Sequence, residues 1–481
     1  MRSRTNGSIG HINIYAHPHW RKSSKMVLCH LRWRRVLLCL CCAPCVLVGS
    51  LCVYIGLVIS YGVTTTSPGG YIPQTLPAYF IAPGLTKQGA LAPHPRSSFW
   101  DHNPHGGALW NQLQLPIDRF YNPILMPKSS RDSSDHLEAN NYTIKKRSFH
   151  RTLTESFSEI GNLSSTMDDF PKLSLQMQMF VRSMHMRDYP VLIQPAKLCG
   201  SSTRKEPGPF LLLAIKSQSL NFANRQVIRQ TWGRAGRLPG ETGKGGVVKR
   251  VFLLGKNNEL NVDEFLLTEN QLYGDILQWD FRDAFFNLTL KDVLLWKWLS
   301  VHCPHTQFVF KGDDDVLVRT AALITYLQQQ MVQSGGQRSE GMKAFVVGDV
   351  IGAALPNRVK STKYFIPESF YRGLYPPYGG GGGVVYSGQL ALRLNRISQR
   401  VHLYPIDDVY VGMCLYRLGV HPIHHPAFLT FDFPKEEMEK PCAYFTILLV
   451  HKRRPAQVKK LWPEMRRNHT ECKNASLRTL I

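Results

Sequence analysis

The sequence lacks the glycine-rich motifs with which many enzymes bind the phosphates of a nucleotide. It contains no GxxxxGK[ST] segment and no GxGxxG segment that opens a helix, so neither a P-loop nor a dinucleotide-binding domain is predicted. It also lacks basic residues interleaved with aromatic residues in the manner of a nucleic-acid interface. Although the formal net charge of the 481 residues is +24, we therefore expect no nucleic-acid partner.

Residues 36–63 contain no charged side chain. About 20 apolar residues are enough to cross a bilayer as a helix, so this segment is predicted to be a transmembrane signal anchor. Residues 1–35 carry eight Lys and Arg residues and no acid, which places this tail in the cytosol and the rest of the chain outside it. A cleaved signal peptide is the alternative, but the long basic lead favours a single-pass type II membrane protein.

Beyond the predicted anchor the chain has five cysteines and no CxxC pair, so a zinc site is not expected. In an oxidising compartment, five cysteines suggest two disulfides and one remaining thiol. Five sequons for N-glycosylation also lie on this side of the anchor, as the modification requires. These features predict a secretory compartment. The sequons are at Asn141, Asn162, Asn287, Asn468 and Asn474.

The part beyond the anchor divides by composition. Residues 64–189 are rich in Pro, Gly, Ser, Asn and His, which predicts an extended stem with a helical stretch near residues 170–187. Residues 190–475 alternate apolar strands with amphipathic helices, and residues 476–481 form a short tail. The alternation predicts an α/β domain with a parallel sheet covered by helices on both faces. Strands are expected at 210–215, 250–254, 276–279 and 307–311, and helices at 223–232, 262–272 and 290–301.

Three consecutive carboxylates, Asp313, Asp314 and Asp315, follow the last predicted strand. Ligands of parallel α/β sheets bind beyond the carboxyl ends of the strands, and clustered carboxylates that leave water need a compensating partner. Mg²⁺ and Mn²⁺ prefer oxygen ligands of this kind. We therefore predict that the triplet holds a divalent cation, and that the cation holds the diphosphate of a nucleotide-sugar. The alternative is a set of acids that stabilises the start of the next helix.

A second acidic pair, Asp407 and Asp408, opens a predicted helix. Asp is common at the N-cap of a helix, which gives one interpretation. The other is a general base, a carboxylate that takes a hydroxyl proton from an acceptor as a bond forms. The pattern alone leaves both interpretations open.

Two tyrosines, Tyr375 and Tyr378, precede a run of five glycines at residues 379–383. Five glycines elsewhere would indicate a flexible linker. Between aromatic residues and a strand, they favour a backbone that approaches a flat ligand closely. The tyrosines could then stack on the faces of sugar rings.

Basic residues give two weaker candidates. Arg225 and Arg229 are four residues apart and share one face of a predicted helix, where they could bind phosphate or lie on a solvated surface. His425, next to His424, could supply an imidazole to the metal, although isolated histidines are more often structural.

Taken together, these motifs resemble those of the Golgi β1,3-glycosyltransferase family, which contains β1,3-galactosyltransferases and β1,3-N-acetylglucosaminyltransferases. The resemblance covers residues 199–472 in the same order. It is most similar to the N-acetylglucosaminyltransferases that extend lactosamine or keratan chains. The matching segments are residues 210–216 (FLLLAIK), 225–233 (RQVIRQTWG), 273–279 (YGDILQW), 286–291 (FNLTLK), 311–316 (KGDDDV), 375–383 (YPPYGGGGG), 407–412 (DDVYVG) and 449–452 (LVHK).

The resemblance implies a GT-A fold, with a parallel or mixed sheet, and an inverting transfer from UDP-N-acetylglucosamine to the 3-hydroxyl of a terminal β-galactose on a glycoprotein or glycolipid. It implies Asp315 as the direct Mn²⁺ ligand, with Asp313 as a further metal contact, and Asp408 as the catalytic base. His425 is similar in position to a metal-ligand histidine of the family. The donor contacts would be Arg225, Arg229, Lys291, Asp313 and Asp314, and the acceptor contacts Tyr375, Tyr378, Gly381, Gly382 and Asp407.

The resemblance also implies a Golgi membrane protein with its catalytic domain in the lumen. It leaves open whether the chain forms a homo-oligomer or a hetero-oligomer with other glycosyltransferases. Among the cysteines, we expect Cys199 to pair with Cys303, and Cys442 with Cys472.

Three other functions are weighed against this one. A β1,3-galactosyltransferase would use the same fold with UDP-galactose. A glycan-binding pseudoenzyme would bind without turnover, but retention of the triplet and of Asp408 argues against it. A glycosidase needs two opposed carboxylates and has no need of a metal-binding triplet.

Overall fold

The computed structural model describes residues 107–121, 167–195, 198–199, 208–257, 262–336, 339–352, 354–440, 442–467, 470–472 and 474–479. These residues belong to one compact unit, Thr75–Ile481. The predicted cytosolic tail and anchor lie outside them, as do Asn141, Asn162 and Asn468. Within the described ranges, no helix has both the length and the apolar character needed to cross a membrane.

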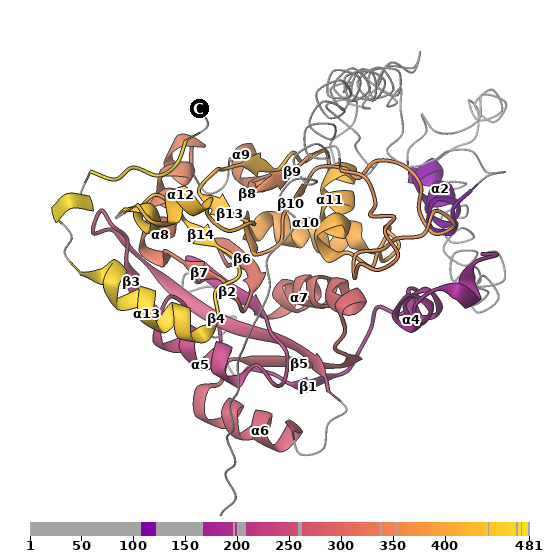
Figure 1. The fold of residues 1–481 in the computed structure, drawn as a ribbon, viewed down its shortest axis with the longest axis horizontal. Coiled ribbons are helices and arrows are strands. Elements are labelled where there is room, and N and C mark those ends of the chain that lie inside the picture. The colour runs from indigo at the N-terminus through magenta and orange to yellow at the C-terminus, as the bar shows by residue number, and fades with distance from the viewer. Residues whose placement is uncertain are drawn as a thin grey trace, which may run out of the picture. The chain divides into compact units, whose positions relative to one another are not determined.

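A nine-stranded mixed sheet forms the centre of the unit, in the order β1-β5-β4-β2-β6-β11-β8-β12, with β3 paired to β4 (Figure 1). The four central strands β5, β4, β2 and β6 are parallel, and β11 runs antiparallel between β6 and β8. The predicted strands are confirmed. The sheet is mixed, because β1, β3 and β11 pair antiparallel with their neighbours, and this agrees with the expected parallel or mixed sheet. The strands are β1 Val191–Ile193, β2 Leu211–Lys216, β3 Gly236–Pro239, β4 Gly245–Lys256, β5 Ile276–Arg282, β6 Phe308–Asp313, β8 Val346–Gly348, β11 Gly383–Ser387 and β12 Ile423–His424.

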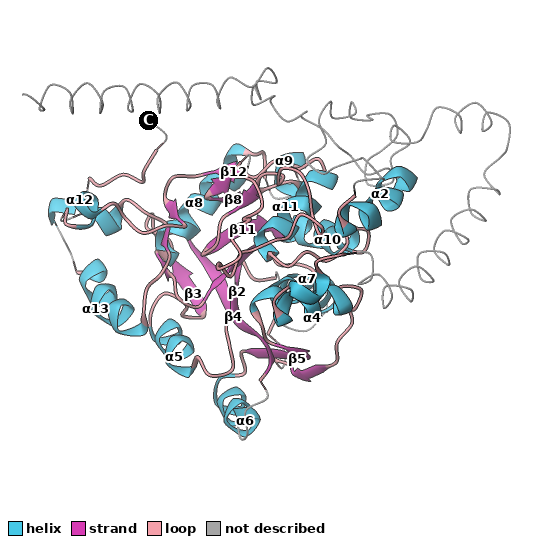
Figure 2. Cartoon of the chain, turned by 45° about the vertical axis from the view of Figure 1, so that its right-hand side comes forward, coloured by secondary structure: helices cyan, strands magenta, loops and turns pink. Residues whose placement is uncertain are grey.

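Helices cover both faces of the sheet because alternate side chains of each buried strand point to opposite sides. In β2, Leu212 and Ala214 belong to one apolar cluster and Leu213 to the other. Figure 2 shows the sheet running between the two helical layers. The first layer contains α4 Leu175–Ser183, α7 Leu288–His302, α10 Gly388–Ser398 and α11 Asp407–Arg417; the second contains α5 Phe222–Gln230, α6 Val262–Tyr273, α8 Thr320–Gln333 and α13 Pro455–Arg466.

Two smaller sheets lie beside the central one and bring distant segments to its edge. In the first, β14 (Leu449–Val450) pairs antiparallel with β7 (Leu317–Val318) and parallel with β13 (Phe428–Leu429). In the second, β10 (Tyr378–Gly379) pairs with β9 (Val350–Ile351). The remaining short helices are α9 Glu340–Lys343, α12 Lys435–Met438, η4 Phe170–Lys172, η5 Phe285–Asn287, η6 Ala443–Phe445 and η7 Thr470–Cys472.

Part of the predicted stem is folded. The helix expected near residues 170–187 is present as α4, and its Phe180 and Val181 are buried in the first apolar cluster. A further helix, α2 (Leu109–Tyr121), was not predicted, and its Trp110 is buried in the first apolar cluster. The expected boundary at residue 190 therefore excludes segments that pack into the core.

Both expected disulfides are present. Cys199 pairs with Cys303, and Cys442 with Cys472, each with a Cα–Cα distance of 5.5 Å. Cys414 is a buried free thiol. The prediction of two disulfides and one thiol is confirmed.

Candidate active site

The parallel register of β2 and β6 brings Lys216 opposite Asp313 at the carboxyl ends of both strands. The Lys216 ammonium lies 3.1 Å from an oxygen of Asp313 and 2.5 Å from an oxygen of Asp407, at the start of α11. Lys216 is itself buried. One buried cation thus joins the strand that carries the acidic triplet to the helix that carries the second acidic pair.

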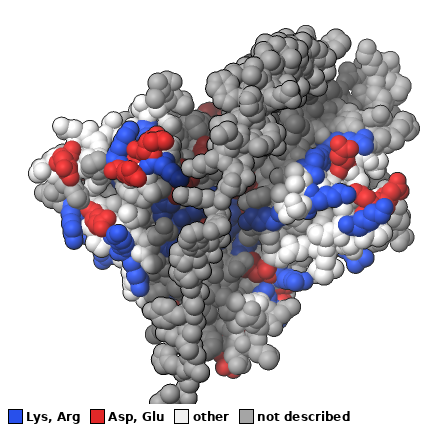
Figure 3. All heavy atoms as spheres, viewed as in Figure 1, with Lys and Arg blue, Asp and Glu red and all other residues white. Residues whose placement is uncertain are grey.

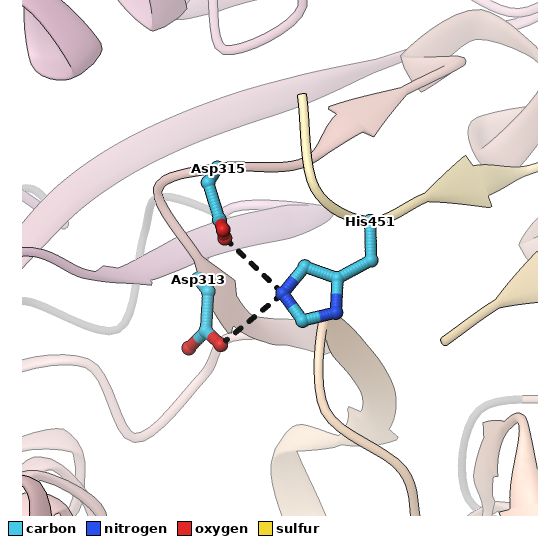
Figure 4. A group of neighbouring side chains, drawn as sticks. All are labelled: Asp313, Asp315 and His451. Atoms are coloured by element: carbon cyan, nitrogen blue, oxygen red, sulfur yellow. Dashed lines mark ion pairs between the residues drawn. The ribbon is translucent and has the colours of Figure 1, made fainter. Parts of the chain in front are cut away.

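Asp313, Asp315 and His451 form the metal-compatible cluster of the described residues (Figure 4). The Nε2 atom of His451 lies 3.2 Å from Asp315 Oδ1 and 3.9 Å from Asp313 Oδ2. One potential ligand atom from each residue falls within 4.8 Å of the others. Two carboxylates and one imidazole suit a divalent cation such as Mn²⁺.

The other ring nitrogen of His451 fixes the direction in which the imidazole points. Nδ1 lies 3.1 Å from the Thr430 carbonyl oxygen, which can only accept, so Nδ1 donates and Nε2 faces the two carboxylates. Burial alone would lower the pKa of His451, but its bond to Asp315 raises it overall. Burial would likewise raise the pKa of Asp315, and the contact with His451 lowers it.

The backbone around His451 is shaped for this position. Lys452 has a φ of 59°, a left-handed conformation that non-glycine residues rarely adopt. It turns the chain so that the Arg453 amide donates to the Asp315 carbonyl oxygen at 2.6 Å. Gly382, with a φ of +107°, approaches from the other side, where an added Cβ would lie 3.1 Å from the His451 side chain.

His425 does not join this cluster. Its ring packs edge-on against Tyr326 at 4.9 Å between centroids, and its Nδ1 accepts from the amide of Ala427. We expected His425 at the metal, but the histidine that lies beside Asp313 and Asp315 is His451, which directly follows β14. The sequence signal for His451 was a histidine at the end of a short apolar strand in the matching segment 449–452.

The middle acid of the triplet has a different role from its neighbours. Asp314 accepts hydrogen bonds from the Ser217 hydroxyl at 2.5 Å and from Asn221 Nδ2 at 2.9 Å. Burial raises the pKa of Asp314 to about 6, against the effect of these two bonds. Asp314 thus links the loop after β6 to the start of α5, and it lines the cavity together with Asp313 and Asp315.

The second acidic pair lies in a buried charge network. The Lys311 ammonium contacts Asp292 at 3.2 Å, Asp408 at 3.2 Å and Asp407 at 3.4 Å. Burial would raise the pKa of Asp407, but Lys216 and Lys311 lower it strongly. Lys216 and Lys311 thus hold Asp407 in place, and Asp407 also lines the cavity.

Asp408 differs from Asp407 in exposure. Its side chain is 17% exposed, compared with 8% for Asp407, and it faces the cavity beside Gly381. Burial and the charge of Asp407 raise its pKa, although Lys311 and Lys216 oppose this. A partly exposed carboxylate with a raised pKa has the properties of a general base.

Of the predicted donor-binding basic residues, Lys291 lines the cavity, whereas the two arginines do not. Arg225 and Arg229 are buried, and both pair with Glu269; Arg229 also pairs with Asp275. Arg225 still supports the site, because its Nη1 donates to the Ser217 hydroxyl. Neither phosphate contact nor a solvated helix face describes these arginines correctly.

Lys291 is held in place by two contacts. Its ammonium donates to the Ser217 carbonyl oxygen at 2.6 Å and lies 2.9 Å from a carboxylate oxygen of Asp283. The side chain is buried, with 1% exposure. It contributes a fixed positive charge to the wall of the cavity.

The two tyrosines predicted to stack on sugars are placed differently. Tyr375 is buried, and its hydroxyl lies 2.9 Å from that of Tyr404, so it cannot present a ring face to a ligand. Tyr378 is half-buried against Gly412 of α11, and burial raises its pKa to about 12 with a contribution from Asp408. The aromatic residues that do line the cavity are Phe285 and Tyr364.

These residues surround one cavity of about 340 Å³. On one side lie the acidic triplet and His451; on another lie Gly381, Asp407 and Asp408. Three lysines line the cavity, Lys216, Lys291 and Lys363, against five aspartates, Asp313, Asp314, Asp315, Asp407 and Asp408. The excess of two carboxylates makes a divalent cation a favourable occupant.

Comparison with known proteins shows the family of the chain. Residues 223–426 match the family described as galactosyltransferase. The chain is 40% identical over 382 residues to N-acetyllactosaminide beta-1,3-N-acetylglucosaminyltransferase 2 of Mus musculus, covering 79% of this chain and 89% of the relative. It is 39% identical over 310 residues to UDP-GlcNAc:betaGal beta-1,3-N-acetylglucosaminyltransferase 7 of Rattus norvegicus, covering 63% and 74%.

The solved structure of the galactosyltransferase LgtC is similar to 54% of this chain and 98% of its own, at 11% identity and a TM-score of 0.28. A similarity this weak supports no argument. The described residues form a mixed α/β fold with an aspartate-rich cavity at the carboxyl ends of its central strands. The sequence relatives make the assignment specific: the chain belongs to the β1,3-glycosyltransferase family and is a glycosyltransferase.

Proposed function

We propose that this chain transfers N-acetylglucosamine from UDP-N-acetylglucosamine to the 3-hydroxyl of a terminal β-galactose and so extends N-acetyllactosamine-type chains. The names of the relatives support the donor, the linkage and the acceptor. The observation that carries the proposal is the single cavity in which Asp313, Asp315 and His451 lie across from Asp408. A donor diphosphate and an acceptor hydroxyl can both be accommodated there.

The protein holds the two reactants on opposite sides of the cavity. The acceptor oxygen attacks the anomeric carbon from the face opposite the departing UDP, and Asp408 takes its proton. This order inverts the configuration at that carbon. A general base contributes on the order of 10²–10⁴-fold in rate. Lys311, bonded to the Asp408 Oδ1 atom, keeps this carboxylate oriented and its other oxygen available.

The donor side is proposed to hold Mn²⁺ through Asp313, Asp315 and His451. When bound, such a cation neutralises the charge that grows on the departing diphosphate, a large electrostatic contribution to catalysis. Lys291 adds a fixed positive charge to the same cavity wall. Asp314 orients the triplet rather than binding the donor directly.

We further propose a single-pass Golgi membrane protein with this domain in the lumen. The uncharged segment 36–63 and its basic flank support the anchor. The disulfides Cys199–Cys303 and Cys442–Cys472 are consistent with an oxidising compartment. Acidic and basic side chains are mixed over the face shown in Figure 3, so charge alone does not select an acidic glycan as acceptor.

A donor panel tests the proposal. The purified chain is incubated with Mn²⁺, a β-galactose-terminated acceptor and either UDP-N-acetylglucosamine or UDP-galactose, and the product linkage is determined. We expect N-acetylglucosamine in a β1,3 linkage, and no product from Asp408→Asn, which keeps the size of the side chain but lacks the base. Preferential transfer of galactose would instead identify a β1,3-galactosyltransferase.

A further inference from the structure

Helix α2 lies outside the segment matched by the family and far along the chain from the proposed base, yet it packs against the elements that carry that base. Its first two amide groups donate to the carbonyl oxygens of Ser369 and Phe370, each at 2.8 Å. These bonds satisfy helix-terminal donors that would otherwise need water or a side-chain cap. Asn111 adds a two-way contact with the backbone of Arg372, at 2.9 and 3.0 Å.

The same helix forms hydrogen bonds with the segment that leads into α11. The Trp110 indole N–H donates to the carbonyl oxygens of His402 and Leu403, each at 3.2 Å. Gln114 donates to the Arg400 carbonyl oxygen and accepts from the His402 amide at 2.8 Å. The backbone that these bonds hold lies five to eight residues before Asp408.

At its other end, α2 forms an ion pair with the last turn of α11. Asp118 accepts two bonds from Arg417, from Nε at 2.8 Å and from Nη2 at 2.7 Å. Both side chains are buried, Asp118 at 4% and Arg417 at 1% exposure. A buried bidentate ion pair fixes the relative orientation of its two side chains as well as the distance between them.

The aromatic side chains extend this contact toward the cavity. Trp110 packs edge-on against Tyr371 and Tyr404, with ring centroids 5.5 and 5.9 Å apart. Tyr404 bonds to the Tyr375 hydroxyl, and Tyr375 packs against Tyr378, which contacts α11 at Gly412. The contacts of α2 therefore reach the segment before α11, its last turn and, through the tyrosines, the middle of α11 at Gly412.

We propose that α2 is a positioning element of the active site, which holds α11 at both ends and thereby fixes Asp408 relative to the acceptor. This inference rests on the proposed function, because it takes Asp408 as the base. None of the α2 contacts described above involves Asp313, Asp315 or His451. Loss of the contacts between α2 and α11 should therefore slow transfer while leaving metal-dependent UDP binding intact.

The test uses the full chain with the conservative change Asp118→Asn, which keeps the size of the side chain and removes its charge. Small displacements of reacting groups reduce rates by roughly tenfold to a hundredfold, and we expect kcat to fall by this amount. The Kd for UDP in the presence of Mn²⁺ should stay within about twofold of the wild-type value, a range that excludes the loss of a charge-assisted contact. Arg417→Lys, which keeps the charge but not the two-pronged contact, serves if Asp118→Asn does not fold.

Asp275→Asn is the matched control. Asp275 is also buried and also pairs with arginines, Arg229 and Arg250. It directly precedes β5, at the amino ends of the parallel strands, whereas the cavity lies at their carboxyl ends. A general loss of stability would affect both variants alike. If positioning is what Asp118→Asn loses, then Asp275→Asn should keep its kcat at temperatures well below its melting point.

Three results would overturn the inference. The first is an unchanged kcat in Asp118→Asn beside an inactive Asp408→Asn, which leaves the proposed function in place. The second is a parallel loss of UDP binding in Asp118→Asn, which would indicate general damage. The third is normal turnover by Asp408→Asn, which refutes the base assignment itself and with it the reason for positioning α11.

Discussion

Replacing Lys311 by Met removes the cation that joins three carboxylates, and its effect can be worked out from the buried network. Lys311 is 3% exposed and lies 3.2 Å from Asp292, which is fully buried. Removing one partner of a buried ion pair typically costs about 3–5 kcal/mol, because the other charge is left uncompensated. For a domain of this size such a loss lowers the melting temperature by on the order of 10 °C.

The variant should also change its response to pH. Burial already raises the pKa of Asp292 to about 6 with Lys311 nearby, and loss of the lysine raises it further. A carboxyl with a higher pKa in the folded state takes up a proton on folding, so it stabilises the fold at low pH, and this stabilisation is lost as pH rises. The deficit of Lys311→Met should therefore shrink between pH 8 and pH 5.

Thermal melting of the purified full chain at several pH values measures both effects. The double variant Lys311→Met/Asp292→Asn is the matched control, because it removes the stranded carboxylate and should recover much of the loss at pH 8. A Lys311→Met variant that melts within about 2 °C of wild type at pH 8 would refute the reasoning, since even 1 kcal/mol should be visible. So would a deficit that grows as pH falls.

Two further predictions concern single positions. Burial, with a smaller effect from the charge of Arg187, lowers the pKa of His402 to about 3. The contribution of neutral His402 to the free energy of unfolding is therefore complete above pH 6.5 and is lost as pH falls toward 3. Between pH 7.5 and 5.5 the loss is about 1.4 kcal/mol. A pH series of melting temperatures should show this slope in wild type and less of it in His402→Gln, and equal slopes would contradict it. Gly382→Ala should cost about 1–2 kcal/mol through its positive φ and weaken Mn²⁺-dependent UDP binding by displacing His451. Gly381→Ala, with no contact to an added Cβ shorter than 3.4 Å, should have the smaller effect in the same titration.

The features that local pattern decides were predictable. The apolar runs gave the central strands, because a strand buried on both faces is apolar along its whole length. The position of the acidic triplet followed from the same reasoning, since β6 ends at Asp313. The number of disulfides and of remaining thiols was also predictable, because five cysteines lie beyond the predicted anchor; the remaining thiol is that of Cys414.

The features that depend on distant contacts were not predictable. Spacing placed Arg225 and Arg229 on one helix face, but only the fold shows that Glu269 and Asp275 bury them. Tyr375 precedes a glycine run and could have stacked on a sugar, yet its ring is buried against those of Tyr371, Tyr378 and Tyr404. Burial of this kind comes from tertiary packing, which composition and periodicity do not record.

The position of His451 at the acids and the folding of part of the predicted stem also depend on distant contacts. His451 reaches the acids because β14 pairs with β7, which follows the triplet directly; this pairing leaves no local signal. Likewise α2 lies in a segment whose composition predicts an extended stem, and its stability comes from burying Trp110 against the rest of the domain.

The central claim is that Asp313, Asp315 and His451 together hold a divalent cation that binds the donor diphosphate. Calorimetric titration of UDP into the purified chain, with and without Mn²⁺, measures it most directly. Wild type and His425→Ala should bind UDP tightly only with Mn²⁺, whereas His451→Ala should lose most of that gain. Mn²⁺-dependent binding that survives in His451→Ala, or binding equally strong without the metal, would contradict the account.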